Sequence, residues 1–243
     1  MQSIDRAMTV AKVLVTTEIG LSITDLSKKC ELPLSTLHRL LKAMIKQGMV
    51  EQDERTKSYT LGTVWLEYGL QIYDKIDYVS KIRPELERLS REVEESVYLS
   101  QPLGMEALII ERIDSENNPI RLHDRLGLRI PMHIGAANKA MLAHMNVSQS
   151  KEVLSALLPK EKIPEMKATL KEIKKQGYAT SYGERTEGTF SVAVVILNRF
   201  EDVVGAISIG LLSFNLTDSR IEFLAKKAVE TGKRISRKLG YHR

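Results

Sequence analysis

The sequence predicts an α+β protein of two domains, in which an N-terminal winged helix-turn-helix is joined by a linker helix to a C-terminal mixed α/β domain. Three observations indicate this fold. Residues 22–61 show two short helices followed by a hairpin, residues 63–77 are apolar around a whole helix, and from residue 96 onward strands and helices alternate irregularly. The predicted boundaries are residues 1–62 for the winged domain, 63–80 for the linker helix and 81–243 for the second domain.

The helix-turn-helix is predicted from its caps and its apolar spacing. Ser22, followed three residues later by Asp25, resembles a capping box that starts a short helix. Pro33 suits the first turn of a second helix better than a helix interior. In that second helix, the apolar residues expected to face inward are Leu37, Leu40, Leu41 and Met44. The outer face is left with hydroxyls and cations, which suits a recognition helix in the DNA major groove.

A wing is predicted directly after the second helix. Gly48 ends that helix, and residues 49–61 are predicted to form two short strands around a charged turn, with Arg55 and Lys57 near its tip. A helix-turn-helix also occurs in proteins that bind no nucleic acid, but a hairpin at this place favours DNA. The residues predicted to bind DNA are Ser22, Ser35, Thr36, His38, Arg39, Lys42, Arg55 and Lys57.

Two further helices are expected around this motif. The helix over residues 3–15 would pack under the motif through Ile4, Ala7, Met8, Ala11 and Leu14. The linker helix over residues 63–77 is apolar on nearly every side and therefore has to be buried on several sides. Burial against its twin in a homodimer would present two recognition helices to two half-sites. Burial within the same chain is the alternative.

Composition places the chain among soluble globular proteins, with 43% hydrophobic and 28% charged residues over 243 positions. The single cysteine, Cys30, excludes an intramolecular disulfide and fits a reducing cytosol. The N-terminus lacks a signal-peptide core, and no apolar run approaches the roughly 20 residues of a membrane helix. A cytoplasmic protein without a membrane partner is expected.

The net charge of +5 is not in itself a signal for DNA. Residues 1–62 carry nine cations against seven anions, whereas the last eighteen residues carry seven cations against one anion. The basic excess is therefore expected to be mainly a solvated face of the C-terminal helix. The prediction of DNA binding depends on where charges are placed and not on their total.

The second domain is predicted to be one mostly antiparallel sheet flanked by helices. Strands are expected over residues 97–100, 107–113, 120–126, 178–182, 190–197 and 203–211. Helices are expected over residues 82–95, 134–145, 148–157, 165–176 and 217–239. Pro84 would lie near the start of the first helix, Ser148 and Thr217 would cap two others, and Gly177 would end the fourth.

The second domain shows no catalytic or metal-binding pattern. Its histidines lack the i,i+4 or paired-cysteine spacing of a metal site, and His133 is expected to be a hydrogen-bonding core or loop residue. No nucleophile motif and no Gly-rich phosphate loop are present. An enzyme with the winged helix as its targeting module is therefore disfavoured, and no cofactor is expected.

Three stretches are candidates for a ligand pocket. Residues 126–139 cross a loop and open a helix with small residues, where unblocked backbone N–H groups suit an anion. On two later strands, Ser191 shares a face with Ala193, and Ser208 shares one with Gly210. If these strands are hairpin neighbours, the two small, hydroxyl-bearing faces form a pocket floor. The alternative is that small residues merely allow close helix packing.

The residues also carry a family resemblance. Leu-Pro-Leu-Ser-Thr-Leu-His-Arg-Leu-Leu at residues 32–41, Gly-Met-Val-Glu-Gln-Asp at 48–53 and Tyr-Thr-Leu-Gly at 59–62 resemble the N-terminal domain of the IclR family of bacterial transcription regulators. Residues 127–139, Gly-Tyr-Ala-Thr at 177–180 with Glu184 and Gly188, and 204–208 are similar to that family's pocket-forming segments. The resemblance implies a GAF-like effector domain and a linker helix that helps dimerisation.

The resemblance also implies a ligand class and a set of ligand-binding residues. Family pockets typically bind small organic acids, and a sugar acid or small keto acid is predicted here. The predicted effector-binding residues are Gly135, Ala136, Ala137, Asn138, Ser181, Ser191, Ser208 and Gly210. Several positions depart from common family residues: Leu34 replaces a basic residue, Asn138 a glycine, Ser181 an acidic residue, Ser191 a cysteine and Gly210 a serine. Asn138 is expected to be able to hydrogen-bond an acid.

Taken together, the sequence predicts a homodimer that binds a double-stranded DNA operator and responds to a small organic acid. Pairing of two dimers into a tetramer is the alternative assembly. Repression is favoured over activation. A winged helix that mediates protein contacts, fused to a sensor domain, is the alternative.

Overall fold

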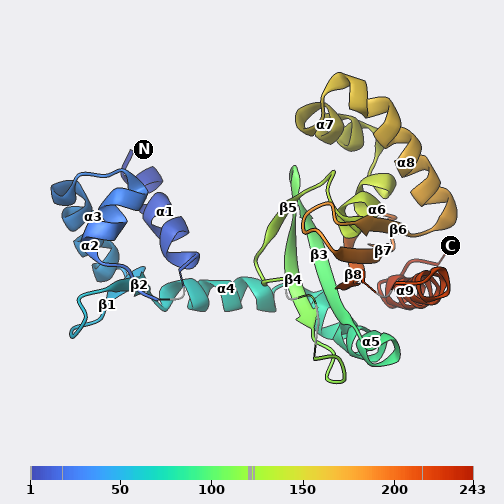
Figure 1. The fold of residues 1–243 in the computed structure, drawn as a ribbon, viewed down its shortest axis with the longest axis horizontal. Coiled ribbons are helices and arrows are strands. Elements are labelled where there is room, and N and C mark those ends of the chain that lie inside the picture. The colour runs from blue at the N-terminus through green and yellow to red at the C-terminus, as the bar shows by residue number, and fades with distance from the viewer. Residues whose placement is uncertain (1, 18, 120–121, 123, 215, 243) are drawn as a thin grey trace. The chain divides into compact units, whose positions relative to one another are not determined.

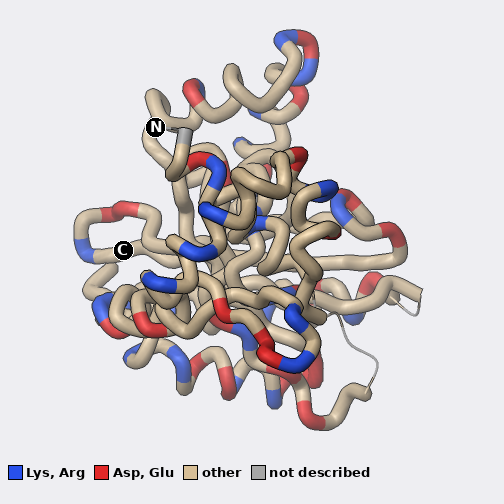
Figure 2. Tube along the Cα trace, turned by 90° about the vertical axis from the view of Figure 1, so that its left-hand side faces the viewer, with Lys and Arg blue, Asp and Glu red and all other residues tan. Residues whose placement is uncertain are grey.

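The computed structural model describes residues 2–17, 19–119, 122, 124–214 and 216–242. The chain divides into two compact units, residues 1–77 and 78–243 (Figure 1). Acidic and basic residues are interspersed along the trace (Figure 2). Within the part of the chain described, no helix has the length and apolar character needed to cross a membrane.

The first unit has three helices around one apolar core, followed by a hairpin and a fourth helix. The elements are α1 (Gln2–Val15), α2 (Ile23–Cys30), α3 (Leu34–Lys46), β1 (Val50–Gln52), β2 (Tyr59–Leu61) and α4 (Val64–Asp74). Ser22 caps α2, because its hydroxyl accepts a hydrogen bond from the Asp25 N–H at 3.2 Å. After α3, Gly48 takes a positive φ of 68°, and the Met49 N–H bonds back to the Met44 carbonyl.

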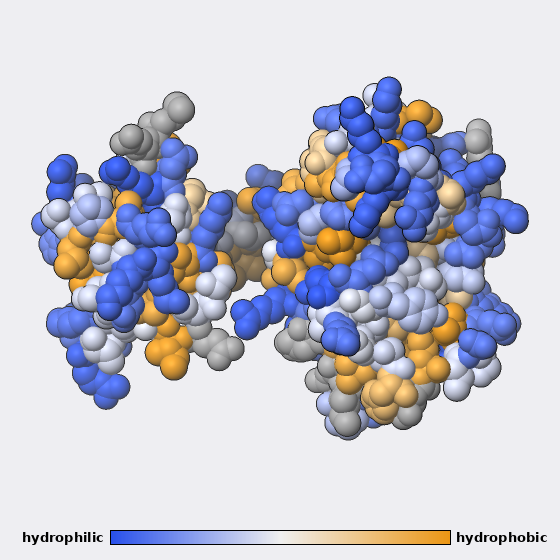
Figure 3. All heavy atoms as spheres, turned by 45° about the horizontal axis from the view of Figure 1, so that its top comes forward, coloured by the Kyte–Doolittle hydropathy of each residue, from blue (hydrophilic) through white to orange (hydrophobic). Residues whose placement is uncertain are grey.

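The buried face of α1 differs from the predicted one. Val10, Ala11 and Leu14 are buried, whereas Ile4 is 69% exposed and Met8 is 39% exposed. The apolar residues of α1 therefore occupy more of its circumference than the core covers. Apolar side chains also reach the surface elsewhere in this unit (Figure 3), and Leu34 and Ile45 are exposed.

The hairpin is anchored at its base to the rest of the unit. Leu21 and Tyr59 exchange both backbone hydrogen bonds, and this isolated antiparallel bridge joins β2 to the segment before α2. Gly62 approaches the chain so closely that a Cβ there would lie 2.1 Å from the Gly48 carbonyl oxygen. The indole N–H of Trp65, in the first turn of α4, donates to the Met49 carbonyl at 2.8 Å.

The linker helix is shorter than predicted, because α4 ends at Asp74 and the next helix begins at Asp77. None of the residues of α4 is buried. Leu66, Leu70 and Tyr73, which recur at i, i+4 and i+7, are 63%, 58% and 37% exposed. The described residues of the first unit therefore do not bury α4.

The second unit is one antiparallel six-stranded sheet with helices on both faces (Figure 1). The strands, in the spatial order β5-β4-β3-β8-β7-β6, are β3 (Ser96–Leu103), β4 (Glu106–Ile113), β5 (Arg129–Pro131), β6 (Ala179–Tyr182), β7 (Thr189–Leu197) and β8 (Val203–Leu212). The helices are α5 (Asp77–Val93), α6 (Ala136–His144), α7 (Val147–Leu157), the 3-10 turn η1 (Lys160–Lys162), α8 (Ile163–Gln176) and α9 (Asp218–Lys238).

The two faces of the sheet are covered by different helices because side chains alternate along each strand. Ala193 on β7 and Ala206 on β8 belong to the core that α6 and α8 cover. The opposite face meets α9, where Gly232 lies so close that a Cβ there would be 2.5 Å from the side chain of Val194. Gly232 is thus required for close packing of α9 on the sheet.

Three local predictions in this unit are wrong. A strand was predicted over residues 120–126, of which residues 120, 121 and 123 lie outside the described part of the chain. The other residues of this range are not in a strand, and β4 pairs instead with residues 129–131. Asn146, not Ser148, caps α7. Pro84 does not lie near the start of its helix, because α5 already begins at Asp77. The turns before Pro84 bury Val79 and Ile82. The predicted stop at Gly177 and cap at Thr217 are confirmed.

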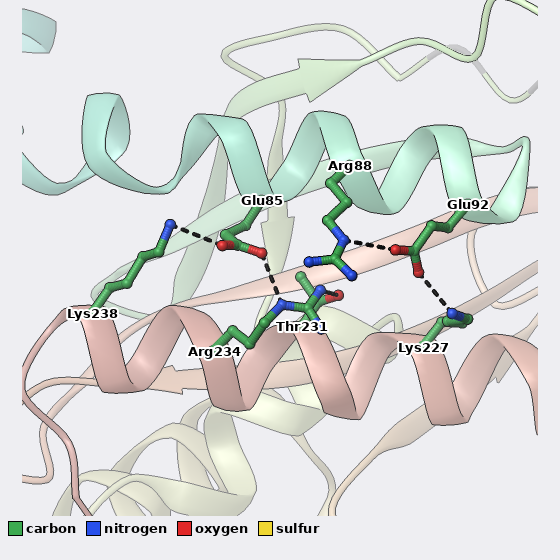
Figure 4. Close-up of polar contacts among 7 residues, drawn as sticks. All are labelled: Glu85, Arg88, Glu92, Lys227, Thr231, Arg234 and Lys238. Carbon is green, nitrogen blue, oxygen red and sulfur yellow. Dashed lines mark hydrogen bonds and ion pairs between the residues drawn. The ribbon is translucent and has the colours of Figure 1, made fainter.

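The basic face of α9 is not simply solvated as predicted. Three of its cations, Lys227, Arg234 and Lys238, face acidic residues of α5 (Figure 4), whereas Lys226, Lys233 and Arg237 are exposed. The pairs between the two helices are Glu85 with Arg234 and Lys238, and Glu92 with Lys227, each at 2.8 Å. Much of the charge excess at the C-terminus therefore serves helix packing in this unit.

Glu92 is expected to make the stability of this unit depend on pH. Hydrogen bonds from Lys227 and Arg88 lower the pKa of Glu92 to about 2. Because the pKa of the unfolded carboxyl is near its ordinary value of 4.5, the contribution is complete above pH 4.5 and is lost as the pH falls towards 2. Glu92→Gln should cost about 1 kcal/mol near neutral pH and progressively less below pH 4.5, in urea unfolding followed by circular dichroism.

The control is Glu87→Gln, which removes an exposed ion pair with Arg83 on the same helix. It should leave the unfolding free energy nearly unchanged across this pH range. An equal loss in both variants, or a Glu92→Gln loss that persists at pH 2, would contradict the assignment.

Candidate DNA interface and effector cavity

The outer face of α3 presents the predicted recognition residues to solvent. Ser35, His38, Arg39 and Lys42 are exposed and Thr36 is partly buried, while Leu37, Leu41 and Met44 on the inner face are buried. His38 and Lys42 line a hollow together with Gln52 of the wing. The recognition helix and the wing therefore form one continuous surface.

The tip of the wing is shaped by Asp53. One carboxylate oxygen of Asp53 accepts hydrogen bonds from the backbone N–H groups of Arg55 and Thr56, at 2.9 and 2.6 Å. The hydrogen bonds from Thr56, first its N–H and then its hydroxyl, lower the pKa of Asp53. Lys57 takes a positive φ of 57°, and the side chains of Arg55 and Lys57 are exposed.

Ser22 has a different local role from the other predicted DNA-binding residues. Its hydroxyl donates to the Asp25 carboxylate at 2.6 Å in addition to accepting from the Asp25 N–H. The hydroxyl is thus engaged in capping α2, although the residue is exposed. The capping function follows from the structure, and a DNA contact at Ser22 stays a prediction.

All eight predicted effector-binding residues line one cavity of about 80 Å³ in the second unit. The prediction that the two small-residue strand faces lie together is correct, because Ser191 is opposite Gly210 and Ala193 is opposite Ser208. Ser181 on β6 extends the first of these rows. The start of α6 forms another part of the lining through Gly135, Ala136, Ala137 and Asn138.

The structure changes the expected roles of the residues at the start of α6. The side-chain amide of Asn138 donates to the carbonyls of Ile130 and Pro131, at 3.0 and 2.9 Å, and so fixes β5 to α6. Its N–H groups are therefore committed and are not donors for an acid, contrary to the prediction. The Gly135 N–H is also committed, because it donates to the Glu184 carboxylate at 2.9 Å.

Glu184 and Lys139 form a pair beside the cavity. The Lys139 ammonium donates to the second oxygen of the Glu184 carboxylate. Burial raises the pKa of Glu184, but the hydrogen bonds from Lys139 and Gly135 outweigh burial and bring the pKa below its usual range. The Glu184 carboxylate therefore stays ionised at the positive end of the α6 dipole.

Eleven lining residues were outside the predicted effector-binding set, and six of these are polar: Tyr98, Ser100, Asp124, Glu184, Arg185 and Thr189. Of these six, Glu184 lies in a segment that the family resemblance had already identified as pocket-forming. The sequence contained a signal for Tyr98 and Ser100, because residues two positions apart on a strand lie on the same face. In the structure Tyr98 on β3 is opposite Ser208 on β8. The ring of Tyr98 fills the space beside Gly210, where a Cβ would lie 3.1 Å from it. Burial raises the pKa of Tyr98, so its hydroxyl stays protonated and donates to the Leu122 carbonyl at 2.5 Å.

Among the described residues no group of three or more histidine, cysteine, aspartate or glutamate side chains is arranged to hold a metal. Contrary to prediction, the buried Nδ1 of His133 has no hydrogen-bond partner within the described chain. Burial lowers the pKa of His133.

A winged helix-turn-helix and a domain with a cavity lined by small and hydroxyl-bearing residues, in one chain, define a one-component transcription regulator. Residues 3–54 match the IclR helix-turn-helix domain, and residues 70–237 match the bacterial transcriptional regulator IclR C-terminal domain. The chain belongs to the IclR family of transcription regulators and is not an enzyme. The first match implies DNA binding, and domains of the second kind bind small-molecule effectors.

Three relatives illustrate the similarity. The HTH-type transcriptional regulator XynR of Escherichia coli (strain K12) is 29% identical over 247 residues, which cover 99% of this chain and 98% of XynR. The crystal structure of the Thermotoga maritima IclR has a TM-score of 0.80 at 25% identity and covers 99% of this chain and 100% of that one. An IclR homologue from Microbacterium hydrocarbonoxydans, complexed with 4-hydroxybenzoate, has the same fold, with a TM-score of 0.81, 22% identity, and 98% and 99% coverage.

Proposed function

We propose that this protein is a repressor that binds a DNA operator through α3 and the wing and is released by a small organic acid bound in the cavity of the second unit. The observation that supports DNA binding most directly is the outer face of α3. Its hydroxyls and cations point to solvent beside a wing whose tip carries two exposed cations. Because its target is chromosomal DNA, the regulator is expected to act in the cytoplasm.

The homodimer is supported by the unburied apolar side chains of α4. A helix with this many exposed apolar side chains is unfavourable in water, and a second copy supplies the same apolar surface by symmetry. A dimer also presents two recognition helices to two half-sites.

Leu70→Glu is therefore expected to shift the protein from dimer to monomer, because it places a charge in the apolar stripe of α4. Sedimentation velocity measures the change in mass. The control is Gln71→Glu, which adds the same charge at the neighbouring polar position. If both variants remain dimers, the dimer contact does not involve this stripe of α4.

The proposed effector class is supported by the cavity lining. Backbone N–H groups at the start of α6 lack intrahelical acceptors, and several hydroxyl groups face the same space. The Microbacterium homologue, which shares the fold, was crystallised with an aromatic acid. A small acid with different affinity for two dimer geometries would change operator affinity, and the operator would change effector affinity by the same factor.

Fluorescence anisotropy with the DNA upstream of the protein's own gene tests the proposal. Binding should be specific against random duplex and should weaken steeply with salt, since phosphate neutralisation releases counterions. Transcription from this DNA in vitro should decrease when the protein is added. Failure to bind any duplex at low salt would instead favour a winged helix that mediates protein contacts.

A further inference from the structure

An ion pair lies within the lining of the cavity. The described residues of the lining include three charged side chains, Asp124, Glu184 and Arg185. Arg185 and Asp124 are 61 positions apart in sequence, and the Arg185 guanidinium donates to the Asp124 carboxylate. The two side chains are only 35% and 16% exposed. A ligand that enters the cavity therefore meets a partly buried cation whose present partner is a carboxylate of the protein.

The other charges near the cavity are already committed. Glu184 is held by Lys139 and by the Gly135 N–H. The Lys139 side chain is 9% exposed, and Lys139 is not among the residues that line the cavity. Arg185 is thus the cation that the described lining offers to a ligand.

A carboxylate that is buried without a counter-charge is strongly unfavourable. An acid in this cavity also lies near the negative charges of Asp124 and Glu184. Its entry is most favourable when it takes over the guanidinium, whose planar fork matches a carboxylate in two-point geometry. The Asp124 carboxylate accepts a hydrogen bond from one nitrogen of that guanidinium.

We propose that the effector is a small hydroxy acid whose carboxylate displaces Asp124 from Arg185. The inference depends on the proposed function, because it takes the cavity to be the effector site. Arg185 then selects acids over neutral ligands, and Asp124 is an internal competitor that sets the affinity.

The ligand is expected to carry a hydroxyl group because Asp124 loses the hydrogen bond from Arg185 when the ligand binds. Once displaced, the Asp124 carboxylate is an acceptor without its donor, and leaving it so is costly. A hydroxyl group beside the ligand's carboxylate can donate to it, whereas a keto acid carries only acceptors. The serine hydroxyls of the lining, which both donate and accept, suit a hydroxylated ligand as well: Ser100, Ser181, Ser191 and Ser208.

The test uses three probes of equal carbon number: glycerate, pyruvate and glycerol. They carry, respectively, an acid with hydroxyls, an acid with a keto group, and hydroxyls without an acid. Binding to the full chain is measured by ligand-observed NMR titration at millimolar concentration and fixed ionic strength. Glycerate should bind more tightly than pyruvate, and glycerol should show no saturable binding.

Two variants separate the roles of the ion pair. Arg185→Gln should weaken glycerate binding by about tenfold or more, as expected for loss of a charge-assisted bidentate contact. Asp124→Asn should strengthen binding of both acids several-fold, and pyruvate should gain more because no displaced carboxylate remains. The gain in Asp124→Asn cannot arise from misfolding. The control Arg129→Gln removes an exposed arginine of the same unit that pairs with Glu106 and should leave binding unchanged.

Each other outcome overturns the inference. Equal glycerate binding by Arg185→Gln and wild type would remove Arg185 from the site. Glycerol or pyruvate binding as tightly as glycerate would remove the hydroxy-acid class, and so would the absence of glycerate binding to both wild type and Asp124→Asn. Operator affinity of the ligand-free wild type is measured in parallel, so that failure of DNA binding is distinguished from failure of this site.

Discussion

Arg39→Ala is expected to weaken specific operator binding by about 1–3 kcal/mol, or about 5- to 150-fold. Arg39 is exposed on the outer face of α3, and its planar fork suits a bidentate contact with guanine in the major groove. Because the contact reads a base, the loss should be much larger on the operator than on random duplex. Fluorescence anisotropy on both duplexes at one salt concentration measures the difference.

The control for this prediction is Arg91→Ala, which removes an exposed arginine from α5 of the second unit. It should leave operator affinity within experimental error. Lys57→Ala at the tip of the wing should weaken binding to both duplexes by a similar factor, since a phosphate contact carries no sequence information. Unchanged operator affinity in Arg39→Ala would show that α3 is not the recognition helix or that Arg39 does not contact a base.

Gly62→Ala is expected to destabilise the first unit by about 3 kcal/mol or more, beyond the usual cost of overpacking. The new Cβ would lie 2.1 Å from the Gly48 carbonyl oxygen and 3.0 Å from the backbone nitrogen of Val50. Neither contact can be relieved by rotating a side chain, so the base of the wing has to move. The fluorescence of Trp65, the single tryptophan, reports this directly because its indole bonds to Met49.

Gly69→Ala is the control for packing within one chain, because a Cβ at Gly69 meets none of the described residues within 4 Å and the residue lies inside α4. It should be neutral or should stabilise the unit by up to about 1 kcal/mol. Since Gly69 borders the apolar stripe of α4, sedimentation velocity verifies that the variant keeps the mass of the wild type. Urea unfolding followed by tryptophan fluorescence compares the two variants. A Gly62→Ala protein as stable as wild type would show that the hairpin adjusts without loss of its anchoring.

The elements with strong local signals were predictable from sequence. Ser22, Thr217 and Gly177 act at helix ends through bonds that span a few residues, so their neighbours in sequence are also their partners. The pairing of β7 with β8 followed from alternation along two strands joined by a short turn. Boundaries were less predictable, because Val79 and Ile82 extend α5 ahead of Pro84 through burial that the local pattern does not reveal.

The sequence by itself determined the winged helix and the outward face of α3, and it predicted eight of the residues that meet around the cavity. What those cavity residues do was decided by the tertiary structure. Lys139 reaches Glu184 across 45 positions, and Arg185 reaches Asp124 across 61. Whether Asn138 offers its amide to a ligand or to Ile130 depends on how β5 packs on α6. Such contacts follow from the packing of distant segments, and a residue's hydrogen-bonding capacity is committed only once its partners are in place.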